Sequence, residues 1–182
     1  MELETRRLIL RPLNNEDAPA MAQALNNINV SRNLARVKFP YTLQDAEAFI
    51  ARQFAFDQRS VVRAIAFKCA PEELIGMVSY ETTQEGKLVF GYWLRECCWH
   101  MRIMSEAAAA LVHHAFAEGG VEALESAYHA DNPNSGRILR RLGFIETHSE
   151  MNFSLARNQT VPTMKLSLAR EDWHSQQKSR AA

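Results

Sequence analysis

Asn132 and Ser135 are two polar residues at the predicted start of a helix, a position suited to anion binding. Asn132 is a preferred N-cap, and Pro133 suits the first helical position, where a missing N–H costs nothing. Apolar residues follow at helical spacing, and Gly143 favours a left-handed helix end. The first turn of a helix leaves backbone N–H groups unpaired, so this start can bind a phosphate. Capping alone explains the same two side chains, and that alternative stays open.

The elements that position this helix follow from hydrophobic periodicity and turn signals. Strands are predicted over residues 8–10, 61–68, 74–80, 87–94 and 124–129, with a closing pair from residue 144 onward and over 163–168. Helices are predicted from Asn14 or Asn15 to about Leu25, from Thr42 to near Asp57, over 104–116 and from Asn132. The three strands between residues 61 and 94 form an antiparallel meander. We expect one α/β (α+β) domain over residues 1–175 and a flexible tail over 176–182.

Composition narrows the class of protein. The chain has 182 residues, 47% hydrophobic and 23% charged, and its 21 basic side chains equal its 21 acidic ones. The chain therefore has no net positive charge to attract nucleic acid or an anionic membrane. An acidic N-terminus and the lack of an apolar run of ~18 residues argue against a signal peptide or membrane span, and a cytoplasmic location is expected.

The cysteines and histidines predict neither disulfides nor a metal. Cys69, Cys97 and Cys98 cannot form a disulfide framework, and the adjacent pair lacks zinc-site spacing. His113 and His114 are consecutive, so they point in different directions and cannot act as paired ligands. These residues are consistent with a reducing compartment and with catalysis that uses no metal.

Two predicted strands lead into helices at the same end of the sheet. Strand 87–94 passes through a short segment into the helix over 104–116, and strand 124–129 passes into the helix begun by Asn132. If these strands are neighbours, both helix N-termini face one cleft. Converging backbone donors at such a cleft favour a pyrophosphate.

Five segments then bear on the family: residues 3–12, 91–94 (Gly-Tyr-Trp-Leu), 105–107 (Ser-Glu-Ala), 132–144 and 168–173. In the fourth segment, Asn132 is followed by Ser135, and Arg141 precedes Leu-Gly-Phe. Over nearly all of its length the chain resembles the GNAT superfamily of N-acetyltransferases, and more closely the RimJ/RimL-like branch that acetylates protein N-termini. The resemblance implies a mostly antiparallel central sheet with a splayed pair of parallel strands, flanked by about four helices.

The resemblance also implies an acetyl-CoA-dependent transfer by direct attack of a primary amine, from a protein N-terminus or a small molecule. The implied cofactor contacts are Trp93, Leu94, Met101, Arg102, Ile103, Met104, Ser105, Asn132, Arg137 and Arg140. Ser135 is the implied proton donor to the leaving thiolate, and Leu139 stands where a related branch uses a tyrosine. Arg137, Arg140 and Arg141 share a turn and suit the nucleotide 3′-phosphate, although a solvated surface position explains any one of them at least as well.

The chain departs from the family in the phosphate loop. The family pattern is Trp-Gly-basic-Gly-Tyr-Ala-Thr-Glu, whereas residues 99–106 read Trp-His-Met-Arg-Ile-Met-Ser-Glu. Glycine permits unusual backbone angles and close approach to phosphate, and both glycines are replaced. Either the loop has moved or the cofactor contact is altered, with the Arg102 guanidinium compensating. The alternative function is a catalytically weakened or inactive binding module.

No general base stands out. Strand 87–94 contains no carboxylate, Glu81 and Glu96 are merely nearby in sequence, and a water chain could serve instead. The acceptor and the oligomeric state, including a homodimer, stay open.

Overall fold

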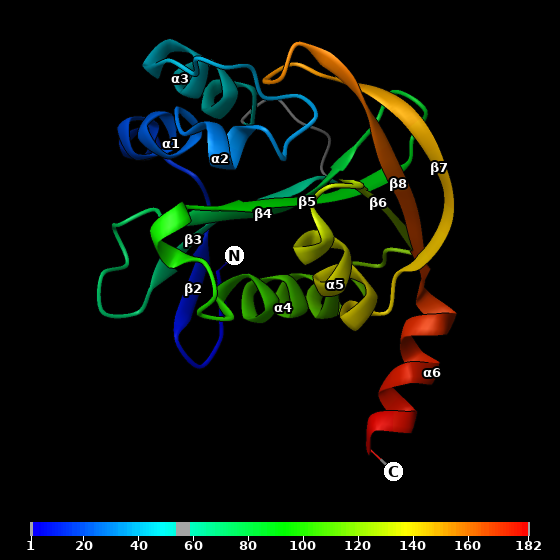
Figure 1. The fold of residues 1–182 in the computed structure, drawn as a ribbon. Coiled ribbons are helices and arrows are strands. Elements are labelled where there is room, and N and C mark those ends of the chain that lie inside the picture. Colours follow the sequence, from blue (N-terminus) through cyan, green and yellow to red (C-terminus); the bar gives the residue numbers. More distant parts are fainter. Residues whose placement is uncertain (1, 54–58, 182) are drawn as a thin grey trace.

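The computed structural model describes residues 2–53 and 59–181 as a central sheet with helices on both faces (Figure 1). The strands are β1 (Leu3–Glu4), β2 (Leu8–Arg11), β3 (Val61–Phe67), β4 (Gly76–Thr82), β5 (Leu88–Leu94), β6 (Ala123–His129), β7 (Ile145–Ser154) and β8 (Gln159–Ala169). The helices are α1 (Ala18–Leu25), α2 (Ile28–Ser31), α3 (Leu43–Gln53), α4 (Ile103–Ala117), α5 (Pro133–Leu142) and α6 (Arg170–Ala181), with short 3₁₀ helices η1 (Asn15–Asp17) and η2 (Glu96–Cys98).

The described strands form one sheet in the order β1-β2-β3-β4-β5-β6-β8-β7. Strands β3, β4 and β5 make the predicted antiparallel meander, with Ser79 opposite Gly91. Strands β5 and β6 are parallel and pair where Val89 lies opposite Glu125. The other neighbouring strands are antiparallel. This arrangement confirms the predicted mostly antiparallel sheet with one splayed parallel pair.

Helices α1 to α3 cover one face of the sheet, and α4 and α5 cover the other (Figure 1). Successive strand residues point to opposite faces, so β5 contributes to both cores. Phe90 packs with Leu111 of α4, whereas Trp93 packs in a second core with Met21 of α1 and Ile50 of α3. The ends of β5 and β6 are thereby held between two packed layers.

Local capping explains where two of the helical segments, α5 and η1, begin. The side chain of Asn132 accepts a hydrogen bond from the Ser135 backbone N–H, Pro133 is the first residue of α5, and Gly143 ends that helix at φ 104°. Asn14 forms a capping box with Asp17 ahead of α1, as its predicted N-cap position allows. These starts confirm the predictions made from sequence.

Four described elements were not predicted, namely β1, α2, η2 and α6. Residues 176–181, expected to belong to a flexible tail, are part of α6. This mostly polar helix is anchored by Trp173, whose ring lies 5.6 Å from that of Phe116. The predicted end of the second helix, near Asp57, lies outside the described residues. Within the described ranges, none of the helices combines the length and apolar character that crossing a membrane requires.

Candidate active site at the divergence of two strands

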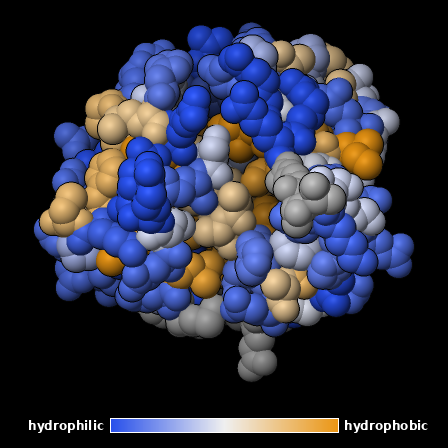
Figure 2. Space-filling model, turned by 90° about the horizontal axis from the view of Figure 1, so that it is seen from below, coloured by the Kyte–Doolittle hydropathy of each residue, from blue (hydrophilic) through white to orange (hydrophobic). Residues whose placement is uncertain are grey.

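Strands β5 and β6 diverge beyond their paired position. Next to it, the buried Ser126 hydroxyl of β6 donates a 2.9 Å hydrogen bond to the Phe90 carbonyl of β5. From there β5 leads through η2 and a loop into α4, and β6 turns into α5. The two helix N-termini therefore follow the diverging strand ends, as predicted. Figure 2 shows a depression containing apolar residues on the face below the sheet of Figure 1.

The start of α5 brings Ser135 to this divergence. The Ser135 backbone N–H donates to the Asn132 Oδ1 atom at 3.3 Å, so Asn132 serves as a cap in this structure. The Ser135 side chain is half-buried. Its hydroxyl lies 2.9 Å from the Tyr92 hydroxyl, and Tyr92 also donates to the Ser135 carbonyl at 3.2 Å. Ser135 thus joins α5 to β5 across the gap between the strands.

Tyr92 is a site residue that sequence reasoning did not single out. Burial raises its pKa to about 12, against a smaller opposite effect of the hydrogen bond with Ser135. The phenol is therefore protonated near neutral pH. Two protonated hydroxyls in hydrogen-bonding contact can pass a proton toward a developing anion. Strand alternation was the available signal, because it places Tyr92 on the same face as Phe90 and Leu94.

The glycine-free loop adopts the backbone conformation that glycine favours. His100 has φ 62° and Arg102 has φ 59°, both in the left-handed region. These are the two positions at which the family pattern has glycine. A non-glycine residue in this region costs roughly 1–2 kcal/mol. The side chains of His100, Met101 and Arg102 are exposed. The side-chain atoms that glycine would lack therefore lie in solvent, where they do not clash with the left-handed backbone.

The first turn of α4 follows this loop. Arg102 is the N-cap residue, but its side chain makes no capping hydrogen bond. The first N–H groups of a helix lack intrahelical partners. Ile103 and Met104, both predicted contacts, are buried in the core, so only their backbones are suited to a phosphate. Ser105 is half-buried in the same turn.

The predicted strand contacts Trp93 and Leu94 are both buried, and they pack in different cores. Leu94 packs on the α4 side, and its carbonyl accepts a 2.9 Å hydrogen bond from the Trp99 indole. Trp93 packs beneath α1 and α3. The two residues therefore line opposite faces of β5 instead of one channel wall.

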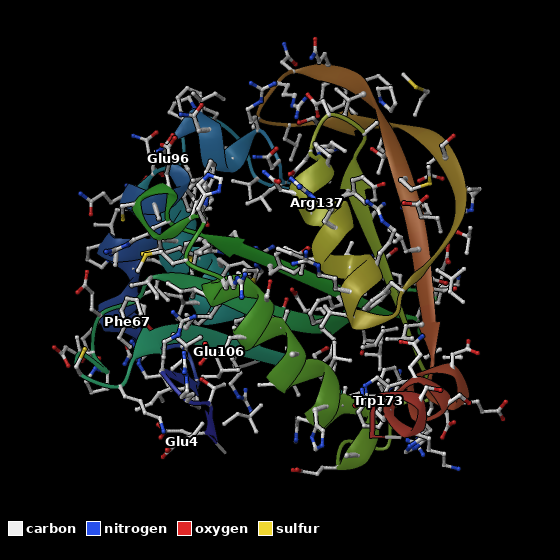
Figure 3. All side chains as sticks on the ribbon, turned by 60° about the horizontal axis from the view of Figure 1, so that its bottom comes forward. Glu4, Phe67, Glu96, Glu106, Arg137 and Trp173 are labelled. Carbon is white, nitrogen blue, oxygen red and sulfur yellow. The ribbon has the colours of Figure 1, made fainter. Side chains whose placement is uncertain are left out.

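The predicted phosphate-binding arginines of α5 have different surroundings. Arg137 lies in the first half of the helix, where its guanidinium donates to Asn134, and its side chain is exposed. Arg140 lies in the last turn and is held by Glu146 and by the Tyr128 hydroxyl. Arg137 is the better placed of the two for a ligand at the helix start (Figure 3).

On the face toward α1 and α3, the sheet has open space above Gly91. A Cβ atom at Gly91 would meet no heavy atom within 4 Å. Ser79 lies opposite Gly91 on β4, and its hydroxyl donates to Glu81 at 3.0 Å. A carboxylate and a hydroxyl of β4 thus lie on the same face of the sheet as this open space.

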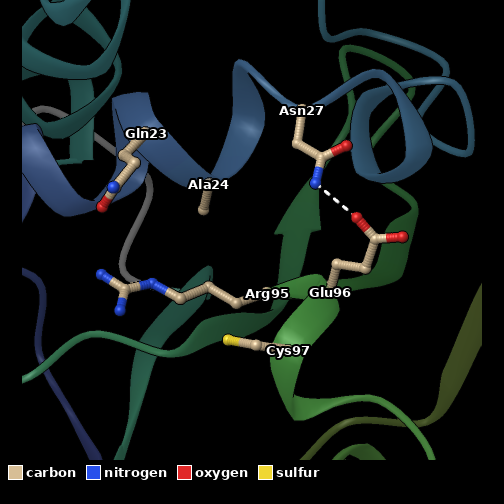
Figure 4. A pocket seen from close by; sticks show the side chains of 6 residues that line it. All are labelled: Gln23, Ala24, Asn27, Arg95, Glu96 and Cys97. Atoms are coloured by element: carbon tan, nitrogen blue, oxygen red, sulfur yellow. Dashed lines mark hydrogen bonds between the residues drawn. The ribbon is translucent and has the colours of Figure 1, made fainter.

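A pocket of about 520 Å³ lies beside the end of β5. It is lined by Gln23, Ala24, Asn27, Arg95, Glu96 and Cys97 (Figure 4). Glu96 accepts hydrogen bonds from the Asn27 amide at 2.6 Å and from the Asn29 amide at 2.9 Å. Each carboxylate oxygen retains acceptor capacity for a cation.

No group of three or more His, Cys, Asp and Glu side chains in the described part of the chain could hold a metal ion. Cys69, Cys97 and Cys98 are free thiols. Burial raises the pKa of Cys98 to about 11, which disfavours its nucleophilic thiolate form.

Comparisons with known proteins agree with this geometry. Residues 7–145 match the acetyltransferase (GNAT) domain family. An uncharacterized N-acetyltransferase of Bacillus subtilis (strain 168), YoaA, is 26% identical over 151 residues, which are 78% of this chain and 81% of YoaA. The ribosomal-protein-serine acetyltransferase of Escherichia coli (strain K12) is 34% identical over 76 residues, 41% of this chain and 42% of the relative.

Solved structures share the fold. RimL, a ribosomal L7/L12 alpha-N-protein acetyltransferase crystallised with coenzyme A, superposes with a TM-score of 0.77 at 18% identity, covering 93% of this chain and 98% of that one. The overall fold is therefore shared with that acetyltransferase.

Proposed function

The chain belongs to the acetyltransferase (GNAT) domain family, and from this premise we propose that it transfers an acetyl group from acetyl-CoA to a primary amine. The observation that carries the proposal is the left-handed backbone at His100 and Arg102, beside the strand divergence and the start of α4. A loop without glycine that keeps this conformation leaves the backbone donors of α4 available for a pyrophosphate. RimL, which shares the fold, was crystallised with coenzyme A.

The residues present fit acetyl-CoA, which would supply the activated acyl thioester. The backbones of residues 103–105 would bind the pyrophosphate, Arg102 would add a charged contact from the loop, and Arg137 would approach the 3′-phosphate. Leu94 and the first turn of α5 would border the pantetheine arm. Of the two arginines of α5 among the predicted cofactor contacts, Arg140 is the less available for the 3′-phosphate, because Glu146 and the Tyr128 hydroxyl already hold its guanidinium.

Ser135 is proposed to donate a proton to the departing thiolate. Tyr92 supports this role, because its protonated phenol lies 2.9 Å from the Ser135 hydroxyl and can replace the proton. The amine must lose a proton on attack, and Glu81 can accept it through water, since the Ser79–Glu81 pair adjoins the space above Gly91. Orientation of both reactants supplies the rest of the rate enhancement.

A protein N-terminus is the proposed acceptor. The relative from Escherichia coli is a ribosomal-protein-serine acetyltransferase, and RimL is a ribosomal L7/L12 alpha-N-protein acetyltransferase. The pocket beside β5 presents Glu96, whose carboxylate is fixed by two asparagine amides and can accept a hydrogen bond from a part of the peptide other than its reacting amine. The three free cysteines support a cytoplasmic location, where thiols stay reduced.

The test is turnover with defined peptides. Purified protein is incubated with acetyl-CoA and peptides that carry a free N-terminal serine or alanine, while released thiol and peptide mass are followed. Matched peptides with a blocked N-terminus and one free lysine are the control. Acetylation of the free N-terminus alone is expected. Modification of lysine alone would reject the N-terminal acceptor, and acetyl-CoA binding without any transfer, small amines included, would support the binding-module alternative.

A further inference from the structure

The N-terminal segment contacts the phosphate loop at the residue between its two left-handed positions. Met101 is flanked by His100 and Arg102, both in the left-handed region. The Met101 carbonyl accepts a 3.0 Å hydrogen bond from the Nη2 atom of Arg7. A residue near the chain start thus holds the most strained part of a loop that is nearly a hundred positions away.

Arg7 is itself held by the helix that the loop begins. Its Nε atom donates to Glu106 Oε2 at 2.8 Å, and its backbone N–H donates to Glu106 Oε1 at 2.9 Å. The Thr5 hydroxyl donates to the same Oε1 atom at 2.6 Å. Figure 3 shows Glu106 in the first turns of α4, close to the N-terminal strands. One guanidinium therefore bridges the first turns of α4 and the loop before it.

The charge on Glu106 supports this bridge. Burial raises its pKa, but the hydrogen bonds from Thr5 and Arg7 together outweigh burial and hold the pKa below its ordinary value. The carboxylate is ionised near neutral pH, so it fixes the guanidinium through charge-assisted hydrogen bonds. Arg7 is about one-third exposed, and its geometry is set by these partners.

We propose that Arg7 is a positioning residue that holds the glycine-free loop in its coenzyme A-binding form. Glycine reaches left-handed angles without strain, whereas His100 and Arg102 require an external constraint. The bond to the Met101 carbonyl supplies that constraint between them. The inference rests on the proposed function, because it names the residue that holds the cofactor loop. We call the contact of Arg7 with Glu106 and the Met101 carbonyl the clamp. Its effect on the loop can also be measured in the ligand-free protein.

The first experiment compares Arg7→Ala with Arg6→Ala. Arg6 is the adjacent exposed arginine, and the described contacts give it no hydrogen bond or ion pair. Calorimetric titration with coenzyme A is expected to show a Kd raised about tenfold or more for Arg7→Ala, and changed less than about twofold for Arg6→Ala. Hydrogen exchange of the ligand-free protein is expected to show faster exchange over residues 99–105 in Arg7→Ala alone.

Two further variants separate loop positioning from general stability. Arg7→Lys keeps the positive charge for Glu106 but cannot span both acceptors with a fork, so it is expected to weaken coenzyme A binding too. In a His100→Gly background, which removes one source of strain, the Arg7→Ala effect on Kd is expected to be at least about threefold smaller. Equal effects in the two backgrounds would overturn the positioning role.

The outcomes distinguish the clamp from the proposed function. If the unmodified protein binds no coenzyme A, the proposed function fails. Hydrogen exchange over residues 99–105 in the two variants then still tests whether Arg7 holds the loop. If the unmodified protein binds coenzyme A, and Arg7→Ala matches Arg6→Ala in both Kd and loop exchange, the clamp is refuted while the function stands.

Discussion

The Tyr92 hydroxyl lies 2.9 Å from the Ser135 hydroxyl and joins the middle of β5 to the first turn of α5. This pair spans the position where β5 and β6 stop pairing. It gives the proposed proton donor a partner from another element, so the two hydroxyls are expected to act together in protonating the thiolate.

Removal of the Ser135 hydroxyl is expected to lower kcat about 100-fold, because general acid catalysis contributes about 10²–10⁴-fold. The KM for acetyl-CoA should change little, since Asn132 caps the Ser135 backbone N–H and not its hydroxyl. Steady-state kinetics of Ser135→Ala, Tyr92→Phe and the double variant check this. The kcat of the double variant should be only slightly below that of Ser135→Ala. If the two single-variant reductions in kcat multiply fully in the double variant, the hydroxyls act independently.

Arg137 and Arg140 form a matched pair on one helix. Arg137→Ala is expected to raise the KM for acetyl-CoA about tenfold, because a charge-assisted contact with the 3′-phosphate is lost. Arg140→Ala should change it much less, since Glu146 and Tyr128 already hold that guanidinium. Competition with 3′-dephospho-coenzyme A is the check. If Arg137→Ala discriminates against this analogue as strongly as the unmodified protein does, Arg137 does not contact that phosphate.

The space above Gly91 allows a steric test of the acceptor side. Gly91→Leu extends a side chain from a position where a Cβ atom meets nothing within 4 Å, so the first carbon of the new side chain causes no clash. The expected result is a kcat/KM for the peptide lowered about tenfold or more with the Kd for acetyl-CoA unchanged. Gly91→Ala is the smaller control, and thermal melting verifies folding. Unchanged peptide kinetics in a folded Gly91→Leu protein would place the acceptor elsewhere.

Glu96 is expected to contribute to binding the acceptor peptide, away from the reacting amine. Glu96→Gln keeps the size of the side chain and an oxygen for one asparagine amide but removes the charge. The peptide KM is expected to rise about fivefold to tenfold while kcat stays nearly constant, because a charged hydrogen bond to substrate is weakened. Kinetics over a range of ionic strength check this. A peptide KM that equals that of the unmodified protein would exclude Glu96 from the binding site.

Asp131 predicts a pH dependence of stability. Hydrogen bonds from Arg157 at 2.7 and 3.0 Å hold its pKa below the ordinary 3.8. A lowered folded-state pKa gives stability that is present above pH 3.8 and is lost as pH falls through the folded value. Asp131→Asn is expected to lower Tm by about 2–4 °C at neutral pH, and by almost nothing at pH of about 2. A difference in Tm that stays constant with pH would contradict this account.

Local signals were enough to predict the start of α5 and the order of most strands. Asn132, Pro133 and Gly143 act through their own backbone and near neighbours, which makes their effect visible in sequence. The contact of Tyr92 with Ser135 depends on strand register and on the crossing of α5, which no local pattern specifies. Helix α6 was missed for a similar reason, because its polar sequence depends on the packing of Trp173.

The conformation of the phosphate loop runs against the preference of its local sequence. His100 and Arg102 have side chains that disfavour left-handed angles, so sequence predicted a displaced loop or an altered contact. The structure retains those angles, and the constraint comes from Arg7, which is distant in sequence. Tertiary contacts thus determine the conformation against the local preference.

The most direct test of the central claim is binding of acetyl-CoA to the unmodified protein, followed by thermal unfolding. Selective binding to the folded state must raise Tm with ligand concentration. The account predicts a rise that saturates and is reduced in Arg137→Ala but hardly in Arg140→Ala. No rise in Tm at millimolar acetyl-CoA would contradict the claim that the divergence of β5 and β6 is a coenzyme A site.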